Sequence, residues 1–181
     1  MGPDLILLYS GGLDSRLLLE VAVLAQQRPF CIIFDYGQRH IQEVTKAKKV
    51  CTDKSVPYKV IRLSLPDVKS ALTSGESHLY QGVSEWYVPA RNLIFISVAA
   101  SCAESMGIDR IWFGANYEDR VNLFPDCYQE WVYKTNELLQ INGSRPIKVE
   151  APLLGWTKQT ITSVAEAMKI NMEEVFSGYG Q

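Results

Sequence analysis

LILLYSGGLDSRLLL, residues 5–19, joins two apolar segments through a short loop of glycine and small polar residues. Residues 5–9 form a continuous apolar run, which is typical of a strand buried on both faces of a sheet. Residues 13–27 carry apolar side chains at helical spacing, and we expect Pro29 to end that helix. The loop at residues 10–15 therefore lies where a buried strand gives way to a helix.

The same alternation of strand and helix continues along the chain. Because the strands are apolar runs rather than polar–apolar alternations, the pattern predicts an α/β fold with an open, parallel five-stranded sheet and helices on both faces, Rossmann-like in outline. A single domain, residues 1–181, fits this length. Within it we expect a short helix at 67–72, a mobile loop near 73–87 and a short carboxyl-terminal tail. The remaining strands are expected at 30–36, 58–63, 111–114 and 147–151, and the remaining helices at 41–55, 93–106, 124–141 and 158–168.

Composition and charge exclude several classes of protein. Hydrophobic residues make up 47% of the chain and charged residues 21%, which is ordinary for a globular protein. The net charge of −2 lacks the basic excess of a nucleic-acid-binding protein, so we expect no nucleic-acid partner. The four cysteines lack zinc-ligand spacing, and no segment resembles a signal peptide or a spanning helix. We therefore expect a cytoplasmic protein with no membrane partner.

The loop after the first strand has the features of an anion-binding cradle. In an open parallel sheet, ligands bind at the carboxyl ends of the strands, and the free N–H groups of a helix start favour an anion there. Gly11 and Gly12 let the backbone approach a ligand, while Ser10 and Ser15 offer hydroxyl donors. Asp14 would repel a bare phosphate, so it suits a Mg²⁺ bridge or a helix cap. The loop is neither a Walker loop nor a dinucleotide fingerprint, and a plain turn capped by Asp14 or Ser15 stays open.

Four further polar clusters follow expected strands or begin expected helices. Each cluster taken alone is also compatible with an ordinary turn or helix cap. Together they gather basic side chains where a ligand of the sheet would bind, in a chain that is acidic overall. The clusters are FDYGQRH at 34–40, YVPARNL at 87–93, GANYEDRVNLFPDC at 114–127 and PLLGWTKQT at 152–160.

Particular residues in these clusters are candidates for binding charged groups. Arg91 can pair with phosphate or carboxylate through two N–H groups, and Asn92 can cap the following helix. Lys158 falls in the first turn of a helix, where a cation is unfavourable unless an anion binds nearby. Asp119 and Asp126 are within reach of a metal or of a substrate amine, or they cap their own loop.

SGGLDS after a first strand resembles the pyrophosphate loop of the N-type ATP pyrophosphatases, which include GMP synthetase, NAD synthetase and tRNA-thiolating enzymes. The five motifs in order resemble the 7-cyano-7-deazaguanine synthase (QueC/ExsB) family over nearly the whole chain. The resemblance implies an adenine nucleotide α-hydrolase-like fold and one ATP pyrophosphatase domain. It also implies a Mg²⁺- and ATP-dependent ligase of queuosine biosynthesis. Such an enzyme converts 7-carboxy-7-deazaguanine and ammonia to the nitrile through an adenylate and an amide.

The resemblance, with the positions of the motifs, implies three groups of site residues. Catalysis is expected of Asp14, Arg91 and Lys158. ATP binding is expected of Tyr9, Ser10, Gly11, Gly12, Leu13, Asp14, Ser15, Phe34 and Gly114. Substrate binding is expected of Tyr36, Gln38, Arg39, His40, Asn92, Asp119 and Asp126. The ligands of the Mg²⁺ ion are not defined by the sequence.

Two features depart from the family pattern. The family ends in four zinc-binding cysteines, but this chain reads Ser177, Gly178, Tyr179 at the place of the first, so we expect no zinc unless another chain supplies ligands. Either the fold holds without zinc or an interface, such as that of a homodimer, supports the carboxyl end. Arg16 stands where the family commonly has a small hydroxyl residue, and it is expected to add a third charge beside the phosphates.

Three alternatives to the synthase stay open. A diverged relative would activate a deazaguanine acid and stop at the amide, or it would use another amine acceptor. A tRNA sulfur-transfer enzyme of the same fold would need a nucleophilic cysteine, for which Cys127 is the candidate. A non-catalytic module would bind ATP without turnover.

Overall fold

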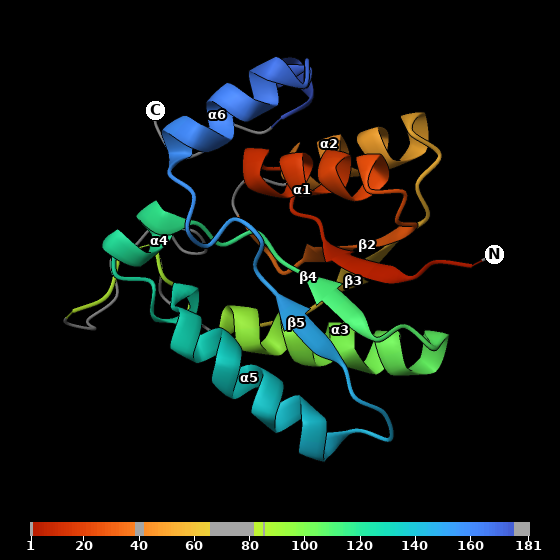
Figure 1. The fold of residues 1–181 in the computed structure, drawn as a ribbon, viewed down its shortest axis with the longest axis vertical. Coiled ribbons are helices and arrows are strands. Elements are labelled where there is room, and N and C mark those ends of the chain that lie inside the picture. Colours follow the sequence, from red (N-terminus) through yellow and green to blue (C-terminus); the bar gives the residue numbers. More distant parts are fainter. Residues whose placement is uncertain (1, 39–41, 66–81, 85, 176–181) are drawn as a thin grey trace.

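The chain folds into a parallel β-sheet with helices on both of its faces (Figure 1). The computed structural model describes residues 2–38, 42–65, 82–84 and 86–175. The strands are β1 (Leu5–Leu8), β2 (Pro29–Asp35), β3 (Tyr58–Arg62), β4 (Arg110–Trp112) and β5 (Lys148–Glu150). The helices are α1 (Leu13–Leu24), α2 (Gln42–Asp53), α3 (Arg91–Met106), α4 (Tyr117–Val121), α5 (Gln129–Asn142) and α6 (Lys158–Ala167), with 3₁₀ helices η1 (Pro125–Cys127) and η2 (Met172–Glu174).

The strand order β3-β2-β1-β4-β5 puts β1 at the centre of the sheet. All four pairings are parallel, and Ile6 of β1 is aligned with Phe30 of β2 on one side and with Ile111 of β4 on the other. The carboxyl ends of the strands therefore share one edge. The order reverses beside β1, which is where sheets of this kind bind their ligands. The predicted α/β fold with an open parallel five-stranded sheet is confirmed.

The two faces of the sheet are buried by different helices. Leu5 and Leu7 of β1 pack with residues of α1, α2 and α6, whereas Ile6 packs with residues of α3 and α5 (Figure 1). All three side chains are fully buried. Successive residues of a strand point to opposite faces, so a central strand covered on both sides must be apolar throughout. This explains the uninterrupted apolar run at the start of the chain.

Helix boundaries differ from the sequence predictions in several places, and those of α1 and α3 bear on the site. Helix α1 ends at Leu24 rather than at residue 27, because the backbone turns into the left-handed region at Gln26, with φ of 57°. Pro29 then begins β2 instead of ending the helix. Helix α3 begins at Arg91 and its N-cap is Ala90, so Asn92 is not the cap that the sequence predicted.

Helix α4 was not expected from the sequence. It has five residues and no buried side chain, so it leaves no apolar pattern.

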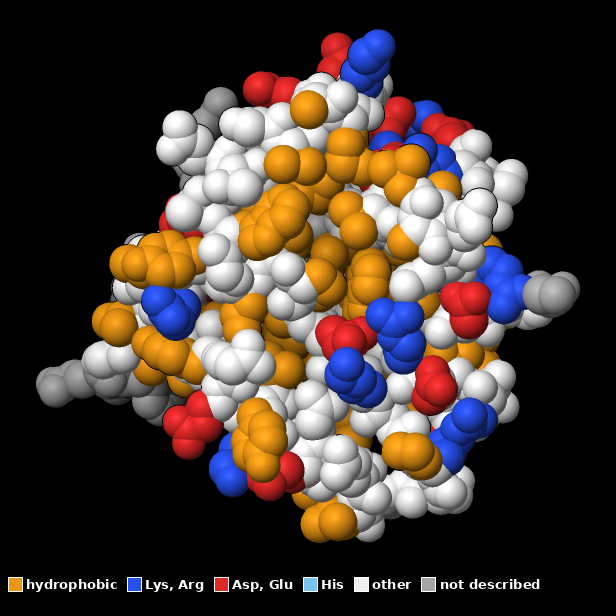
Figure 2. All heavy atoms as spheres, in the orientation of Figure 1, with side chains coloured by type: hydrophobic (Ala, Val, Ile, Leu, Met, Phe, Trp, Pro, Cys, Tyr) orange, Lys and Arg blue, Asp and Glu red, His pale blue; other side chains and the backbone are white. Residues whose placement is uncertain are grey.

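Some of the sequence predictions concern residues outside the described part of the chain. These are the expected helix at 67–72, residues 73–81 and 85 of the expected loop, and the end of the tail at 176–181. None of the described helices is long and apolar enough to cross a lipid bilayer. On the face in Figure 2, basic and acidic side chains of the described residues are interspersed.

Candidate active site

The glycine–serine loop lies between the end of β1 and the start of α1. Gly11 has φ of +87°, and a β-carbon there would lie 2.9 Å from the carbonyl oxygen of Glu43 in α2, so only glycine fits. Gly12 is the N-cap of α1 and no side chain caps it, so neither Asp14 nor Ser15 is the cap that the alternative of a plain turn required. The Ser15 hydroxyl donates to the Gly12 carbonyl at 3.0 Å, and Ser10 Oγ accepts from the Gly12 N–H at 3.2 Å. The serines thus hold the loop in shape, while the first N–H groups of the helix lack intrahelical partners.

Asp14, in the first turn of α1, connects the loop to two distant segments. Its Oδ2 accepts hydrogen bonds from Lys158 Nζ at 2.6 Å and from Asn116 Nδ2 at 3.1 Å. Its Oδ1 is buried and has no hydrogen-bond partner among the described residues. Gly114 permits this approach, because a β-carbon there would lie 3.2 Å from the Cβ of Asp14. Three of the predicted site residues therefore meet where the strand order reverses, namely Asp14, Gly114 and Lys158.

Asp119 lies in the electrostatic neighbourhood of Asp14 and Lys158. Its Oδ2 accepts from the Asn116 N–H at 3.0 Å, while Asn116 Oδ1 accepts from the Asp119 N–H at 3.1 Å, which forms a capping box at the start of α4. Burial raises the pKa of Asp119 to about 6, with Lys158 opposing the rise and Asp14 adding to it. Two carboxylates thus lie close together. No group of three or more potential metal ligands forms among the described residues.

Arg91, the first residue of α3, lies over Tyr36 just beyond the end of β2. Arg91 Nη1 donates to the Tyr36 hydroxyl at 2.9 Å, and the guanidinium carbon lies 5.6 Å from the ring centre. Phe34, expected at the ATP site, stacks on Phe95 with ring centres 4.0 Å apart. Since its side chain is buried in the α3 layer, Phe34 can offer a ligand only its backbone at the strand end.

Gln38 closes the turn that follows β2. Its amide oxygen accepts from the Tyr36 N–H at 2.9 Å, and its amide nitrogen donates to the Phe34 carbonyl at 3.2 Å. Both polar ends of this buried side chain are therefore engaged within its own turn. Arg39 and His40, which were also expected at the substrate site, lie outside the described residues.

Asn92 lies in the first turn of α3, and Asp126 is a buried residue of η1. The Cys127 thiol points at the Asp126 carboxylate, with Sγ 3.7 Å from Oδ1. Burial raises the pKa of Asp126, and the positive charge of Arg91 opposes that rise. Arg91 and Asp126, both predicted for the site, therefore lie close enough to influence each other electrostatically.

Tyr9 and Leu13 flank the loop but face the core beneath it. The Tyr9 side chain is 1% exposed, and its hydroxyl has no hydrogen-bond partner in the described part of the chain. Burial accordingly raises the pKa of Tyr9. Leu13 packs against the same cluster of apolar side chains. Both residues, expected at the ATP site, shape the floor of the loop through packing.

Glu43 is a candidate residue that the sequence analysis missed. It lies in the first turn of α2, with its backbone against Gly11. Burial raises its pKa to about 7, and Arg91 acts in the opposite direction. The only signal in the sequence is its position, three residues after His40 at the same junction of strand and helix.

Arg16 points away from the loop, so the expected third charge beside the phosphates is wrong. Its side chain is 3% exposed and forms ion pairs with Glu20 one turn further along α1 and with Glu174 of η2 at 3.3 Å. Lys46 of α2 donates to the carbonyl of Val175 at 3.0 Å. Arg16 and Lys46 therefore tie the segment after α6 to α1 and α2.

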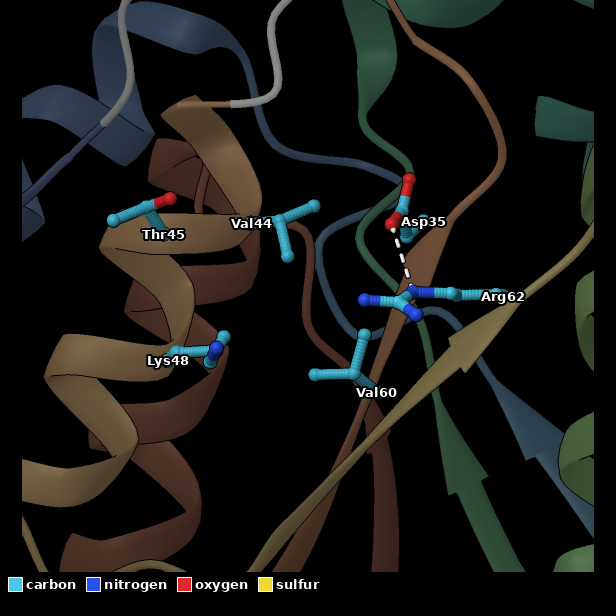
Figure 3. Close-up of a pocket in the computed structure, with 6 residues that line it drawn as sticks. All are labelled: Asp35, Val44, Thr45, Lys48, Val60 and Arg62. Carbon is cyan, nitrogen blue, oxygen red and sulfur yellow. Dashed lines mark ion pairs between the residues drawn. The ribbon is translucent and has the colours of Figure 1, made fainter.

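A separate pocket of about 540 Å³ opens at the carboxyl ends of β2 and β3, beside α2 (Figure 3). Figure 3 shows an ion pair between Asp35 and Arg62, with 3.6 Å between Oδ2 and Nε, at its strand side. Its lining residues are Asp35, Val44, Thr45, Lys48, Val60 and Arg62. None of the residues predicted for the site lines this pocket.

Comparison with protein families gives a match over nearly the whole chain. Residues 4–181 match the model of the family described as queuosine biosynthesis protein QueC. A 7-cyano-7-deazaguanine synthase of Alteromonas mediterranea is 32% identical, over 99% of this chain and 85% of that protein. A protein of the same name from Picrophilus torridus is 36% identical, over 96% of this chain and 77% of that protein.

Two solved structures share the fold at low sequence identity. A predicted subunit of tRNA methyltransferase from Methanocaldococcus jannaschii has a TM-score of 0.61 at 22% identity, covering 91% of this chain and 74% of that one. The U34-tRNA thiolase NcsA from Methanococcus maripaludis has a TM-score of 0.63 at 15% identity, covering all of this chain and 62% of that one. At these identities the likeness concerns the fold alone.

Proposed function

The chain belongs to the QueC family, and we propose that it is a 7-cyano-7-deazaguanine synthase. In this proposal a single ATP pyrophosphatase domain converts 7-carboxy-7-deazaguanine and ammonia to the nitrile, with ATP cleaved to AMP and pyrophosphate at each of two activations. A carboxylate needs such activation because hydroxide is a poor leaving group, and adenylation replaces it with AMP. The observation that carries the proposal is the meeting of Asp14 and Lys158 where the glycine–serine loop passes into α1, in a chain of this family.

In the proposed mechanism the glycine–serine loop binds the pyrophosphate that leaves ATP. The N–H groups at the start of α1 and the hydroxyls of Ser10 and Ser15 are suited to phosphate oxygens. The Lys158 ammonium, held by Asp14, would stabilise the negative charge that develops on the phosphates. Gly114 and the backbone of Phe34 would form the adjoining walls of the ATP site.

The residues present suit a Mg²⁺ ion. Asp14 Oδ1 is buried without a partner among the described residues, and Asp119 supplies a second carboxylate nearby. Magnesium is commonly held by one or two carboxylates together with substrate phosphates, so these two residues would hold it. When bound, the ion would neutralise charge on the departing pyrophosphate.

The proposed substrate side of the site is the region of Arg91. Arg91 and Tyr36 present a cation and a hydroxyl, and Asn92 and Asp126 present an amide and a carboxylate. We assign to this side the residues predicted from the sequence, including Gln38, Arg39 and His40.

The four cysteines are free, which suits the reducing cytoplasm that we propose as the compartment. A zinc-free carboxyl end and a homodimer remain predictions.

A turnover assay tests the proposed function. The protein is incubated with ATP, Mg²⁺, 7-carboxy-7-deazaguanine and ammonium, and AMP, amide and nitrile are quantified by mass spectrometry. We expect nitrile, with two AMP released for each nitrile. AMP without amide or nitrile would overturn the synthase, and accumulation of amide alone would favour the diverged ligase. Binding of ATP without release of AMP would favour the non-catalytic module.

Sulfur transfer is a weaker alternative because of the surroundings of Cys127. The side chain is 4% exposed, and burial together with the Asp126 carboxylate raises the pKa of its thiol. A nucleophilic cysteine needs an accessible thiolate, which this setting disfavours. Cys127→Ser should leave AMP release with the deazaguanine acid within about twofold, whereas it would abolish sulfur transfer.

A further inference from the structure

Asn116 is a fully buried residue of the cluster at 114–127, and the sequence analysis did not assign it to the site. Its amide nitrogen donates to Asp14 Oδ2 at 3.1 Å, and its amide oxygen accepts from the Asp119 N–H at 3.1 Å. Its backbone N–H donates to Asp119 Oδ2 at 3.0 Å. One buried residue therefore connects the two carboxylates to which the proposed function assigns the Mg²⁺ ion.

The two carboxylate oxygens of Asp14 have different surroundings. Oδ2 accepts from Asn116 and also from Lys158 Nζ, at 2.6 Å. Oδ1 is buried and has no hydrogen-bond partner among the described residues. A buried carboxylate oxygen without a donor is costly unless a ligand satisfies it. Both donors on one oxygen thus leave the other oxygen for a cation.

Asn116 is better placed than Lys158 to decide which oxygen stays free. The Lys158 side chain is 48% exposed and its ammonium ends a flexible stem, so it can move between the two oxygens of Asp14. The Asn116 amide is buried, and its bond to the Asp119 N–H fixes its orientation. Hydrogen bonds to a carboxylate orient it as a metal ligand. We propose that Asn116 is a positioning residue that holds Asp14 by Oδ2 and keeps Oδ1 available for the Mg²⁺ ion that accompanies ATP.

The segment around Asn116 is itself held in place by its neighbours. The Tyr117 N–H donates to the Trp156 carbonyl at 3.0 Å, and the Glu118 carboxylate accepts from the Lys158 N–H at 2.8 Å. The start of α4 therefore contacts the first turn of α6 as well as the Asp14 carboxylate of α1. The inference rests on the proposed function, because it takes ATP with Mg²⁺ as the ligand of the site.

Asn116→Ser tests the inference, because serine is also a good N-cap but is too short to reach Asp14. Calorimetry measures the Kd of α,β-methylene-ATP, which cannot be cleaved between its α and β phosphates, with and without Mg²⁺. In the unchanged protein we expect Mg²⁺ to tighten binding of this analogue. The variant should reduce that gain about tenfold, and kcat for AMP release should fall by about 10-fold to 100-fold. The Kd without Mg²⁺ should stay within about twofold.

Asn171→Ser is the matched control, since it makes the same exchange at the N-cap of η2, where the side chain accepts from the Glu173 N–H at 3.0 Å. Both Kd values and kcat should stay within about twofold of those of the unchanged protein. If Asn116→Ser does not fold, Asn116→Thr, which offers the same capping oxygen, takes its place under the same criteria.

Three results would overturn the inference. One is a folded Asn116→Ser variant that keeps the gain from Mg²⁺ within about twofold. Another is an equal weakening of the analogue with and without Mg²⁺, which would indicate a purely structural role. The third is the absence of any gain from Mg²⁺ in the unchanged protein. These titrations need no deazaguanine, so a failure to form nitrile would overturn the proposed function while the titrations still decide the inference.

Discussion

Lys158 Nζ and Asp14 Oδ2 lie 2.6 Å apart although 144 positions separate the two residues in the sequence. The contact joins the first turns of α6 and α1. A lysine in the first turn of a helix is opposed by the helix dipole, and here the Asp14 carboxylate offsets that cost. The pair keeps an ammonium beside the loop where phosphate charge would develop.

Lys158→Met should slow AMP release by about 100-fold, because the charge beside the loop is lost while the apolar stem is kept. Lys134→Met removes an exposed lysine on α5 and serves as the matched control, which should stay within about twofold. Single-turnover AMP release at saturating ATP measures both. Near-normal release by Lys158→Met would show that the ammonium has no part in the chemistry.

Asp119 should make stability depend on pH. The folded protein holds its pKa near 6, above the ordinary value of 3.8, so the protonated carboxyl favours folding. The contribution of this group to the free energy of unfolding is therefore highest below its ordinary pKa and declines as the pH rises through about 6. Asp119→Asn removes this titration and keeps an oxygen for the Asn116 N–H.

Urea unfolding of both proteins across that pH window measures the effect. We expect the variant to gain stability relative to the unchanged protein as the pH rises. A difference that stays constant with pH would contradict the raised pKa of Asp119.

Gly11→Ala should destabilise the fold more than Gly37→Ala does. Both glycines have positive φ, 87° and 82°, so each variant carries a similar backbone penalty of about 1 kcal/mol. Of the two, only Gly11 would bring the new methyl group against an atom of the described residues, the Glu43 carbonyl oxygen at 2.9 Å, so α2 or the loop must shift. Chemical denaturation gives both free energies of unfolding, and equal losses would mean that the loop tolerates the methyl group.

Arg16→Ala should cost about 3 kcal/mol of stability, because it removes the buried partner of two carboxylates. Glu174→Gln should cost less, about 1 kcal/mol, since Glu174 is partly exposed and Arg16 keeps Glu20. A double-mutant cycle with thermal or urea unfolding measures the coupling. KM for ATP should change by less than about twofold in the folded variants, whereas a large rise would return Arg16 to the phosphate site.

The sheet and its covering helices were predictable because burial on both faces forces an apolar sequence. Short polar elements were not, and α4 depends on a capping box between Asn116 and Asp119 rather than on an apolar stripe. The hydrogen bond from Asn116 to Asp14 depends on how the starts of α4 and α1 pack, which no local pattern encodes. Lys158 was predictable in part, since its unfavourable place in a helix indicates a nearby anion.

The direction of the Arg16 side chain could not be predicted from the sequence for a related reason. Its sequence neighbours belong to the loop, but its partner Glu174 comes from the far end of the described chain. A side chain as long as that of arginine can extend toward the loop or away from it, and only the packed structure decides which. Distance along the sequence from a motif is therefore a poor guide to a role within it.

The strand order also governs how the chain emerges from the ribosome. β1, β2 and β3, with α1 and α2, are made first, and they can pair as one half of the sheet before Arg91 of α3 has been synthesised. During that interval Ile6 and Ile32 present an apolar surface whose cover, α3 and α5, has yet to be made. The nascent protein thus exposes one apolar face of its sheet during translation. Such exposure favours chaperone binding and makes fragments ending before α3 prone to aggregate.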